Sequence, residues 1–245
     1  PLVFVGTAGI IKKEIAGKNT SEKQALPGDY IVMVGGRVGK DGIHGATFSS
    51  EAMDSGSPST AVQIGDPITQ KKMSDALTKE AIFKNLYNSI TDNGAGGLSC
   101  SVAEMAKESG GCVVDLEKVP VKYQGLQPWE IWISESQERM TLAVPPEKWN
   151  EFNDLMIKRG VEATVIGEFT KDTKCVVNYE GKTIVDLDMD FLHNGLPQRP
   201  MTTTYTKKTQ IEPELNKQML KAVNVYLPDH LLGVLSNNNI ASNEF

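Results

Sequence analysis

Residues 27–36, PGDYIVMVGG, contain the clearest single structural element in this sequence. The Pro-Gly-Asp start is typical of a turn, and the β-branched, uniformly apolar run that follows is typical of a buried strand. A glycine-dense segment, GGRVGKDGIHGATFSS, occupies residues 35–50 directly after it. We therefore expect a buried strand that opens into a long glycine-rich loop.

A helix is expected next, over residues 66–87, DPITQKKMSDALTKEAIFKNLY. Asp66 can accept hydrogen bonds from the first free N–H groups, and Pro67 suits the first helical position. Met73, Leu77 and Ala81 recur at a spacing of four, which places them on one apolar face.

Strands and helices then alternate until a hairpin interrupts the pattern. Residues 88–99 predict a short strand and a glycine-rich turn, and a helix follows that Gly110 and Gly111 terminate. A second helix over residues 145–160 carries Trp149, Phe152 and Met156 on one face and ends at Gly160. The remaining expected strands are residues 112–121, 162–170 and 174–192, the last folded at a Glu180-Gly181 turn.

This order predicts an α/β fold, a mixed sheet layered with helices, over residues 27–190. From Phe191 the chain is polar and interrupted by proline, as in an interdomain linker, and residues 214–240 then suggest one or two short helices. The opening stretch, PLVFVGTAGII, is expected to be a buried strand. We accordingly divide the chain into residues 1–26, 27–190 and 191–245.

Composition excludes several classes of function. The net charge is -6, from 31 acidic and 25 basic residues, and no block of Lys and Arg could follow a phosphate backbone, so nucleic acid is not an expected partner. The apolar opening stretch is too short to span a bilayer, so no membrane partner is expected. The three cysteines show no Cys-x-x-Cys spacing, which favours a reducing, cytoplasmic location.

Both ends of the chain suggest a piece of a larger protein. The sequence starts abruptly within an apolar run, without an initiator Met, and stops on Phe245 shortly after an expected helix start.

The glycine-rich loop and the residues before the first helix could contact a ligand. Glycines in residues 35–50 would let backbone N–H groups approach an anion, although the segment matches neither a P-loop nor a dinucleotide fingerprint, and an ordinary loop is the alternative. His44 is either a ligand-facing donor or structural. Gln63 could read an amide-bearing substrate or be a surface glutamine, and Asp66 is assigned to capping.

Asp92 ends the short strand before the glycines of TDNGAGGLSCS. A carboxylate is a hard ligand suited to Mg²⁺, and free N–H groups of the next helix would favour a phosphate. The same strand-Asp-Gly turn also occurs without ligands.

Three adjacent polar residues, Glu135, Ser136 and Gln137, interrupt stretches that should be buried. They could line a small polar ligand, whereas a structural turn would more often use Gly, Asn or Pro. A polar loop is the alternative. The neighbouring Glu138-Arg139 pair is interpreted as solvated or locally paired, with Arg139 beginning the next buried strand.

Taken together and in order, four segments resemble one family: GGRVGKDGIHGATFSS, VQIGDPITQKKM, ITDNGAGGLSCSVAEMA and QPWEIWISESQERM. They are similar to phosphoribosylformylglycinamidine synthase, the glutamine-dependent amidating enzyme of purine biosynthesis. SNNNIAS near the C-terminus also resembles the start of that family's second half. The resemblance covers nearly the whole chain.

The resemblance implies an ATP-dependent carbon-nitrogen ligase that converts formylglycinamide ribonucleotide to the amidine. ATP activates the formamide oxygen as a phosphoryl ester, which ammonia from glutamine displaces. It also implies a fold like the C-terminal domain of aminoimidazole ribonucleotide synthetase over residues 27–190. Residues 1–26 would then end the preceding synthetase-like domain, and residues 191–245 would form the linker and the start of the second half.

Carried over residue by residue, the resemblance makes Gln63, Glu135, Ser136 and Gln137 substrate-binding residues and Asp92 a Mg²⁺ ligand. No catalytic residue is assigned, because the segments that hold the family's catalytic histidine, its ATP-contacting lysine and a further magnesium-binding glutamate have no match here. No glutaminase-like Cys-His-Glu arrangement is present, so a glutaminase domain or subunit must supply ammonia. We therefore expect the chain alone to be inactive.

Two other readings remain. The chain could be a non-catalytic ribonucleotide-binding or scaffold domain of the same superfamily, in which case start and stop codons would bound it. It could instead belong to another superfamily member, such as aminoimidazole ribonucleotide synthetase or selenophosphate synthetase, which share the architecture but lack the SESQER segment.

Overall fold

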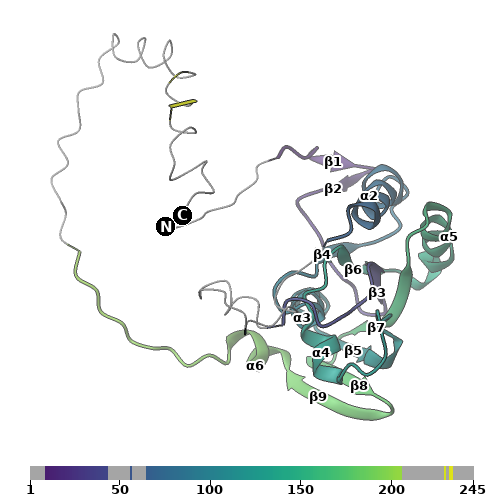
Figure 1. The fold of residues 1–245 in the computed structure, drawn as a ribbon. Helices are drawn as coiled ribbons and strands as arrows, with labels where there is room; N and C mark the ends of the chain where they lie inside the picture. Colours follow the sequence, from purple (N-terminus) through teal and green to yellow (C-terminus); the bar gives the residue numbers. More distant parts are fainter. Residues whose placement is uncertain (1–8, 44–55, 57–64, 206–228, 230–231, 234–245) are drawn as a thin grey trace, which may run out of the picture. The chain divides into compact units, whose positions relative to one another are not determined.

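The computed structural model describes residues 9–43, 56, 65–205, 229 and 232–233 (Figure 1). The chain divides into two compact units, Ile11–Pro197 and a second one made of Pro1–Ile10 with Gln198–Phe245. Most of the second unit lies outside the described residues, so the fold below is that of Ile11–Pro197.

A seven-stranded sheet with the order β4-β6-β3-β7-β5-β8-β9 forms the centre of this unit. All neighbouring strands are antiparallel except β5 and β8, which are parallel. A separate two-stranded ribbon precedes the sheet. The strands are β1 Glu14–Ile15, β2 Lys18–Asn19, β3 Tyr30–Gly35, β4 Ser89–Asp92, β5 Gly111–Asp115, β6 Arg139–Val144, β7 Ala163–Thr170, β8 Lys174–Tyr179 and β9 Lys182–Asp188.

Two apolar layers cover opposite faces of this sheet. The helices are α2 Pro67–Ala76, α3 Leu98–Ser109, α4 Pro128–Ile133, α5 Trp149–Arg159 and α6 Met189–Asn194. Helices α2 and α5 pack together on one face over Val32 and Val34, whereas α3 covers the other face over Ile31 and Met33. Strand β3 is therefore buried on both sides, which explains its uninterrupted apolar sequence. The predicted mixed α/β fold is confirmed.

The predicted start of α2 is also confirmed. Asp66 Oδ1 accepts hydrogen bonds from the N–H groups of Ile68 at 3.0 Å and Thr69 at 3.3 Å. Beyond Ala76 the helix widens into a π-helical segment, Leu77–Ala81, that the sequence pattern did not predict. Met73, Leu77 and Ala81 are nevertheless all buried.

The predicted hairpin at residues 180–181 is confirmed, because Glu180 (φ 49) and Gly181 (φ 73) join β8 to antiparallel β9 with left-handed backbone at both positions. The strand predicted over residues 112–121 is too long. It ends at Asp115 and turns into the 3₁₀ segment Leu116–Lys118, which lets Leu116 pack in the core at 0% exposure. A second 3₁₀ turn, Pro146–Lys148, leads into α5.

The predictions for the two chain ends fall largely outside the described residues. In the opening stretch only Gly9, Ile10 and Ile11 are described, and they lie outside any strand, with both isoleucines exposed. The helices expected in residues 214–240 fall almost wholly outside the description. The linker expected from Phe191 starts inside α6, because the Asp188 carboxylate caps that helix at the N–H groups of Asp190 and Phe191.

No helix in the described part of the chain combines the length and apolar character needed to cross a bilayer.

Candidate functional site

The predicted Glu135-Ser136-Gln137 site lies in a short connection between α4 and β6. Helix α4 ends at Ile133 and β6 begins at Arg139, so residues 134–138 form what we call the 134–138 turn. Ser136 is 0% exposed, whereas Glu135 and Gln137 are half-buried. The three adjacent residues therefore differ in what a ligand can reach.

Arg139 holds this turn from inside the protein. Its Nε donates to the carbonyl oxygen of Ser136 at 2.7 Å, and its Nη2 donates to that of Ser134 at 2.5 Å. Arg139 is 3% exposed, and burial lowers its pKa to about 10, partly offset by the charge of Asp41. The prediction that Arg139 begins a buried strand is confirmed. Its interpretation as part of a solvated or locally paired Glu138-Arg139 feature is wrong, because the guanidinium satisfies buried main-chain carbonyls.

Ser136 joins the turn to the glycine-rich loop that follows β3. The Gly39 N–H donates to Ser136 Oγ at 2.9 Å, and the Ser136 hydroxyl donates to Asp41 Oδ2. The Glu135 N–H donates to the Asp41 carbonyl oxygen at 2.9 Å. The Ser136 hydroxyl is thus buried and fully engaged with the loop that it connects to the turn.

Asp41 is the charged centre of this joint. Lys122 Nζ lies 2.6 Å from Asp41 Oδ2. Burial raises the pKa of the Asp41 carboxyl, but hydrogen bonds from Lys122 and Ser136 outweigh that effect and lower the pKa below its usual value. Asp41 is therefore ionised at neutral pH and binds two segments that are distant in sequence.

Two glycines make the close approach of these segments possible. A Cβ on Gly35 (φ +107) would lie 2.1 Å from the Glu138 carbonyl oxygen, and one on Gly97 (φ +56) would lie 1.9 Å from the Ser134 carbonyl oxygen. Both values are far shorter than any real contact, so only glycine fits at either position. The 134–138 turn is consequently packed between the end of β3 and the start of α3.

Asp92 ends β4, and its side chain is exposed. The loop that follows contacts the 134–138 turn, since the Gly96 N–H donates to Glu135 Oε1 at 3.2 Å. The charge of Asp92 also contributes to the raised pKa of the Cys100 thiol, after burial and Glu104, which places the carboxylate near the first turn of α3. The fold thus brings Asp92 and Glu135, 43 positions apart by their numbers, to the same edge of the sheet.

The free N–H groups expected at the start of α3 are largely engaged. Those of Gly97, Ser99 and Cys100 donate to the carbonyl oxygens of Gly94, Gly96 and Gly97, because residues 94–97 fold into tight turns. These N–H groups therefore do not support the phosphate-binding site that the sequence led us to expect at the start of α3.

A buried polar cluster lies beneath the same loop. Asn93 Oδ1 accepts from Ser101 Oγ at 2.6 Å and from Thr141 Oγ1 at 3.1 Å. Asn93 is 5% exposed, and its Nδ2 has no hydrogen-bond partner among the residues described. Asn93 and Asp41 were not singled out from the sequence, because nothing in their local pattern distinguishes them from surface polar residues.

Two predicted site residues, Gln63 and His44, lie outside the described residues. Gly65, two positions after Gln63, is described, and a Cβ there would lie 2.7 Å from Glu138 Oε1. The Gln137 side-chain amide donates to the Glu135 carbonyl oxygen at 3.1 Å. Among the described residues no three His, Cys, Asp or Glu side chains gather in a group able to hold a metal ion.

Comparison with known proteins identifies the family. Residues 27–180 match the family described as AIR synthase related protein, C-terminal domain. The phosphoribosylformylglycinamidine synthase subunit PurL of Methanothermobacter marburgensis is 37% identical over 246 residues, which are 99% of this chain and 33% of that protein. The subunit PurL of Methanopyrus kandleri is 40% identical over 202 residues, 81% of this chain and 27% of that protein.

Solved structures of the same subunit are also similar. Thermotoga maritima PurL complexed with FGAR matches with a TM-score of 0.69 and 30% identity, over 79% of this chain and 32% of that one. The same protein complexed with ATP matches with a TM-score of 0.64 and 28% identity, over 77% and 29%. The chain thus spans about a third of the length of these relatives. These matches confirm the resemblance seen in the sequence motifs: the chain belongs to the family of AIR synthase related proteins, and within it is similar to phosphoribosylformylglycinamidine synthase subunits.

Proposed function

We propose that this chain forms one wall of the active site of a phosphoribosylformylglycinamidine synthase. That enzyme would use ATP and glutamine-derived ammonia to convert formylglycinamide ribonucleotide to its amidine. The observation that carries the proposal is the convergence of three segments: the glycine-rich loop after β3, the loop after Asp92 and the 134–138 turn. The similarity to relatives complexed with FGAR and with ATP supports it.

Within this wall we assign substrate binding to the half-buried Glu135 and Gln137, together with Gln63. A ribonucleotide offers hydroxyl, amide and phosphate groups, so convergent carboxylate and amide side chains suit it better than an apolar pocket. Ser136 is included as a positioning residue, because its hydroxyl is occupied by Gly39 and Asp41.

Asp92 is the proposed Mg²⁺ ligand. Magnesium in such sites is commonly held by one or two carboxylates together with substrate phosphates and water, and the single exposed carboxylate of Asp92 fits that mode. When bound, the ion would neutralise charge on a transferring phosphoryl group. Asp92 would hold the ion at the sheet edge, and Glu135 would orient the substrate beside it.

The remaining parts of the proposal concern the whole protein. We assign residues 1–26 to a preceding synthetase-like domain, 27–190 to the synthetase-like C-terminal domain and 191–245 to a linker and the start of a second half. Catalysis would need those further domains and a glutaminase partner, a view supported by the similarity to the structure named PurLQS from Thermotoga maritima, with a TM-score of 0.64 and 26% identity. Three free cysteines, Cys100, Cys112 and Cys175, favour a cytoplasmic location.

Calorimetric titration of the purified chain with formylglycinamide ribonucleotide, with and without Mg²⁺, tests the binding roles. We expect Mg²⁺ to strengthen binding and Asp92→Asn to remove that gain. Asp154→Asn, at an exposed carboxylate on α5, is the matched control and should change nothing. A Mg²⁺ effect that persists in Asp92→Asn would contradict the metal assignment.

An activity assay separates the proposal from a scaffold role. We expect no glutamine- or ammonia-dependent amidine formation by the 245-residue chain alone, and activity when the missing domains and a glutaminase are supplied. Amidine formation by the chain alone would refute the expected inactivity. Ribonucleotide binding without activity in the completed assembly would favour the non-catalytic binding domain.

A further inference from the structure

Glu138, the last residue of the 134–138 turn, has a left-handed backbone with φ +57. This conformation is strained for a residue with a Cβ, and such strain is concentrated at functional sites. Four other non-glycine residues in the described part of the chain have a positive φ, and each is either exposed or an asparagine, which tolerates the conformation. They are Ala16, Asn85, Thr173 and Glu180. Glu138, in contrast, is a half-buried glutamate.

The fold requires the left-handed backbone at this position but not the glutamate. The Glu138 carbonyl oxygen accepts a hydrogen bond from the Gly36 N–H at 2.9 Å, and the next residue, Arg139, begins β6. A glycine in place of Glu138 would adopt the same backbone conformation without strain. These main-chain contacts therefore do not explain the glutamate, and the reason for it lies in the side chain.

The Glu138 carboxylate forms no hydrogen bond or ion pair with any residue that the structure describes. Its Oε1 lies beside Gly65, where a Cβ would be 2.7 Å away. Gly65 is two positions after Gln63, which we assign to substrate binding. A half-buried carboxylate has lost part of its hydration and gains from a hydrogen-bond donor, so Glu138 is suited to meet a ligand.

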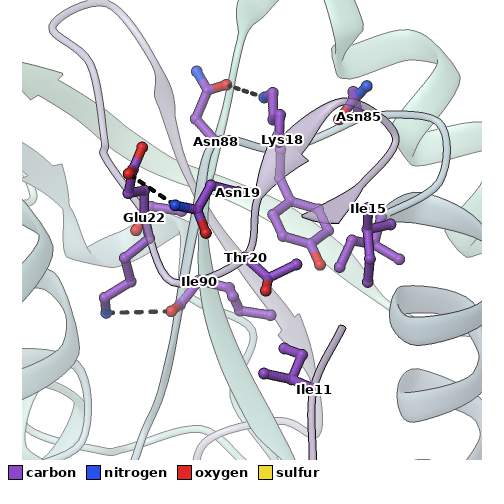
Figure 2. Close-up of a pocket in the computed structure, with 13 residues that line it drawn as sticks. Ile11, Ile15, Lys18, Asn19, Thr20, Glu22, Asn85, Asn88 and Ile90 are labelled. Carbon is purple, nitrogen blue, oxygen red and sulfur yellow. Dashed lines mark hydrogen bonds between the residues drawn. The ribbon is translucent and has the colours of Figure 1, made fainter. Parts of the chain in front are cut away.

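The charged side chains around a second cavity, between the β1–β2 ribbon and the start of β4, differ from Glu138 in this respect (Figure 2). The volume of this cavity is about 160 Å³. Lys18 and Glu22 each bond to the side chain of a neighbouring asparagine, at 3.3 and 2.9 Å, and Lys23 Nζ donates to Thr91 Oγ1 at 2.8 Å. The charged groups of that wall are thus engaged within the protein, whereas the carboxylate of Glu138 is available.

The surroundings of Glu138 indicate which ligand group it would meet. An ionised carboxylate only accepts hydrogen bonds, so its partner must be a donor. Asp66, the residue after Gly65, is a second anion here, because hydrogen bonds from Thr69 lower the pKa of its carboxyl. Two negative charges would repel a phosphate. The ribose hydroxyls of a ribonucleotide are uncharged donors, and Asp or Glu carboxylates bind such hydroxyls in dinucleotide sites.

We propose that Glu138 is a further substrate-binding residue, whose carboxylate accepts a hydrogen bond from a ribose hydroxyl of the ribonucleotide. The amide side chains of Gln63 and Gln137, which offer both donors and acceptors, would then meet the amide part of the substrate. This inference rests on the proposed function and extends it, because it assigns the ribose to the end of the turn that faces Gly65.

Calorimetric titration of the purified chain with formylglycinamide ribonucleotide tests the assignment. Glu138→Gln keeps the size of the side chain but removes its charge, and we expect it to weaken binding about tenfold, equally with and without Mg²⁺. Either the 2′-deoxy or the 3′-deoxy analogue should bind the parent chain about tenfold more weakly than the ribonucleotide does. The same analogue and the ribonucleotide should bind Glu138→Gln equally, because the hydroxyl and the carboxylate form one contact.

Thermal unfolding separates a ligand-binding role from a structural one. Glu138→Gly should weaken binding as Glu138→Gln does, but it should raise the melting temperature by about 2 °C, because it relieves the backbone strain. Glu180→Gly is the matched control, since Glu180 is exposed and has φ +49 in the β8–β9 turn. It should raise the melting temperature by a similar amount and leave binding unchanged.

Unchanged binding by Glu138→Gln, a loss confined to titrations with Mg²⁺, or equal binding of the ribonucleotide and both analogues by the parent chain would each overturn the assignment. A lower melting temperature of Glu138→Gly would also overturn it, because the side chain would then support the fold. All four results leave the proposed function standing. Absence of ribonucleotide binding by the parent chain would instead reject the binding role in the proposed function, and the assignment of Glu138 with it.

Discussion

Replacing Arg139 by Met tests whether the 134–138 turn depends on its buried guanidinium. Met has a similar length but cannot donate to the carbonyl oxygens of Ser134 and Ser136, which lie 2.5 and 2.7 Å from Arg139 nitrogens. Each hydrogen bond from a charged donor contributes about 1.5–3 kcal/mol, and both carbonyls would lose a partner. Part of this loss is offset, because the variant no longer buries a cation.

We therefore expect Arg139→Met to lower the free energy of unfolding by about 2–4 kcal/mol. Urea denaturation of the chain, followed by tryptophan fluorescence, measures this change. Arg37→Met is the matched control, because Arg37 forms an exposed ion pair with Glu162 and its loss should cost less than about 1 kcal/mol. Equal effects of the two substitutions would refute the role assigned to Arg139.

Three further predictions concern the same joint. Gly97→Ala should lower the free energy of unfolding by more than about 3 kcal/mol, because the added Cβ would collide with the Ser134 carbonyl oxygen. Gly181→Ala is the control: Gly181 also has a positive φ, but the space around it is open, so this substitution should lower the free energy of unfolding by only about 1 kcal/mol. Ser136→Ala should cost about 1–3 kcal/mol in denaturation and weaken ribonucleotide binding, since the partners of its hydroxyl lose their hydrogen bond. The pKa of the Asp41 carboxyl is lower in the folded state than its ordinary value of 3.8, so the ionised carboxylate stabilises the fold above that pH, and this stabilisation is lost as the pH falls through the folded-state pKa. Asp41→Asn should therefore flatten the pH dependence of the melting temperature below about pH 4. A slope identical to that of the parent protein would contradict this prediction.

Local elements were predictable because each follows from a pattern of neighbouring residues. The uniformly apolar run of β3, the Asp66 cap, the Gly110 and Gly160 helix ends and the turn at residue 180 all depend on contacts within a few positions. The element boundaries that we predicted wrongly are those set by packing between residues distant in sequence. Leu116 turns into the core and shortens β5, and Phe191 continues α6 into the expected linker.

The site divides in the same way. The candidate residues Asp92, Glu135, Ser136 and Gln137 were identified by residue type and by resemblance, and their roles remain predictions. Sequence alone could not indicate that Ser136 is fully buried while its two neighbours are half-buried, because exposure depends on the loop that packs over the turn.

By itself, then, the sequence determined the type and order of the main elements, the mixed α/β class and the family. Only the tertiary structure decided that Arg139 is a buried support, that Asp41 joins the glycine-rich loop to the 134–138 turn, and that Asp92 and Glu135 share one edge of the sheet. The physical reason is the distance along the chain over which the interactions act. Helix caps and turns are set by interactions between near neighbours, whereas burial and ion pairing depend on strand order, which brings together residues that are tens of positions apart.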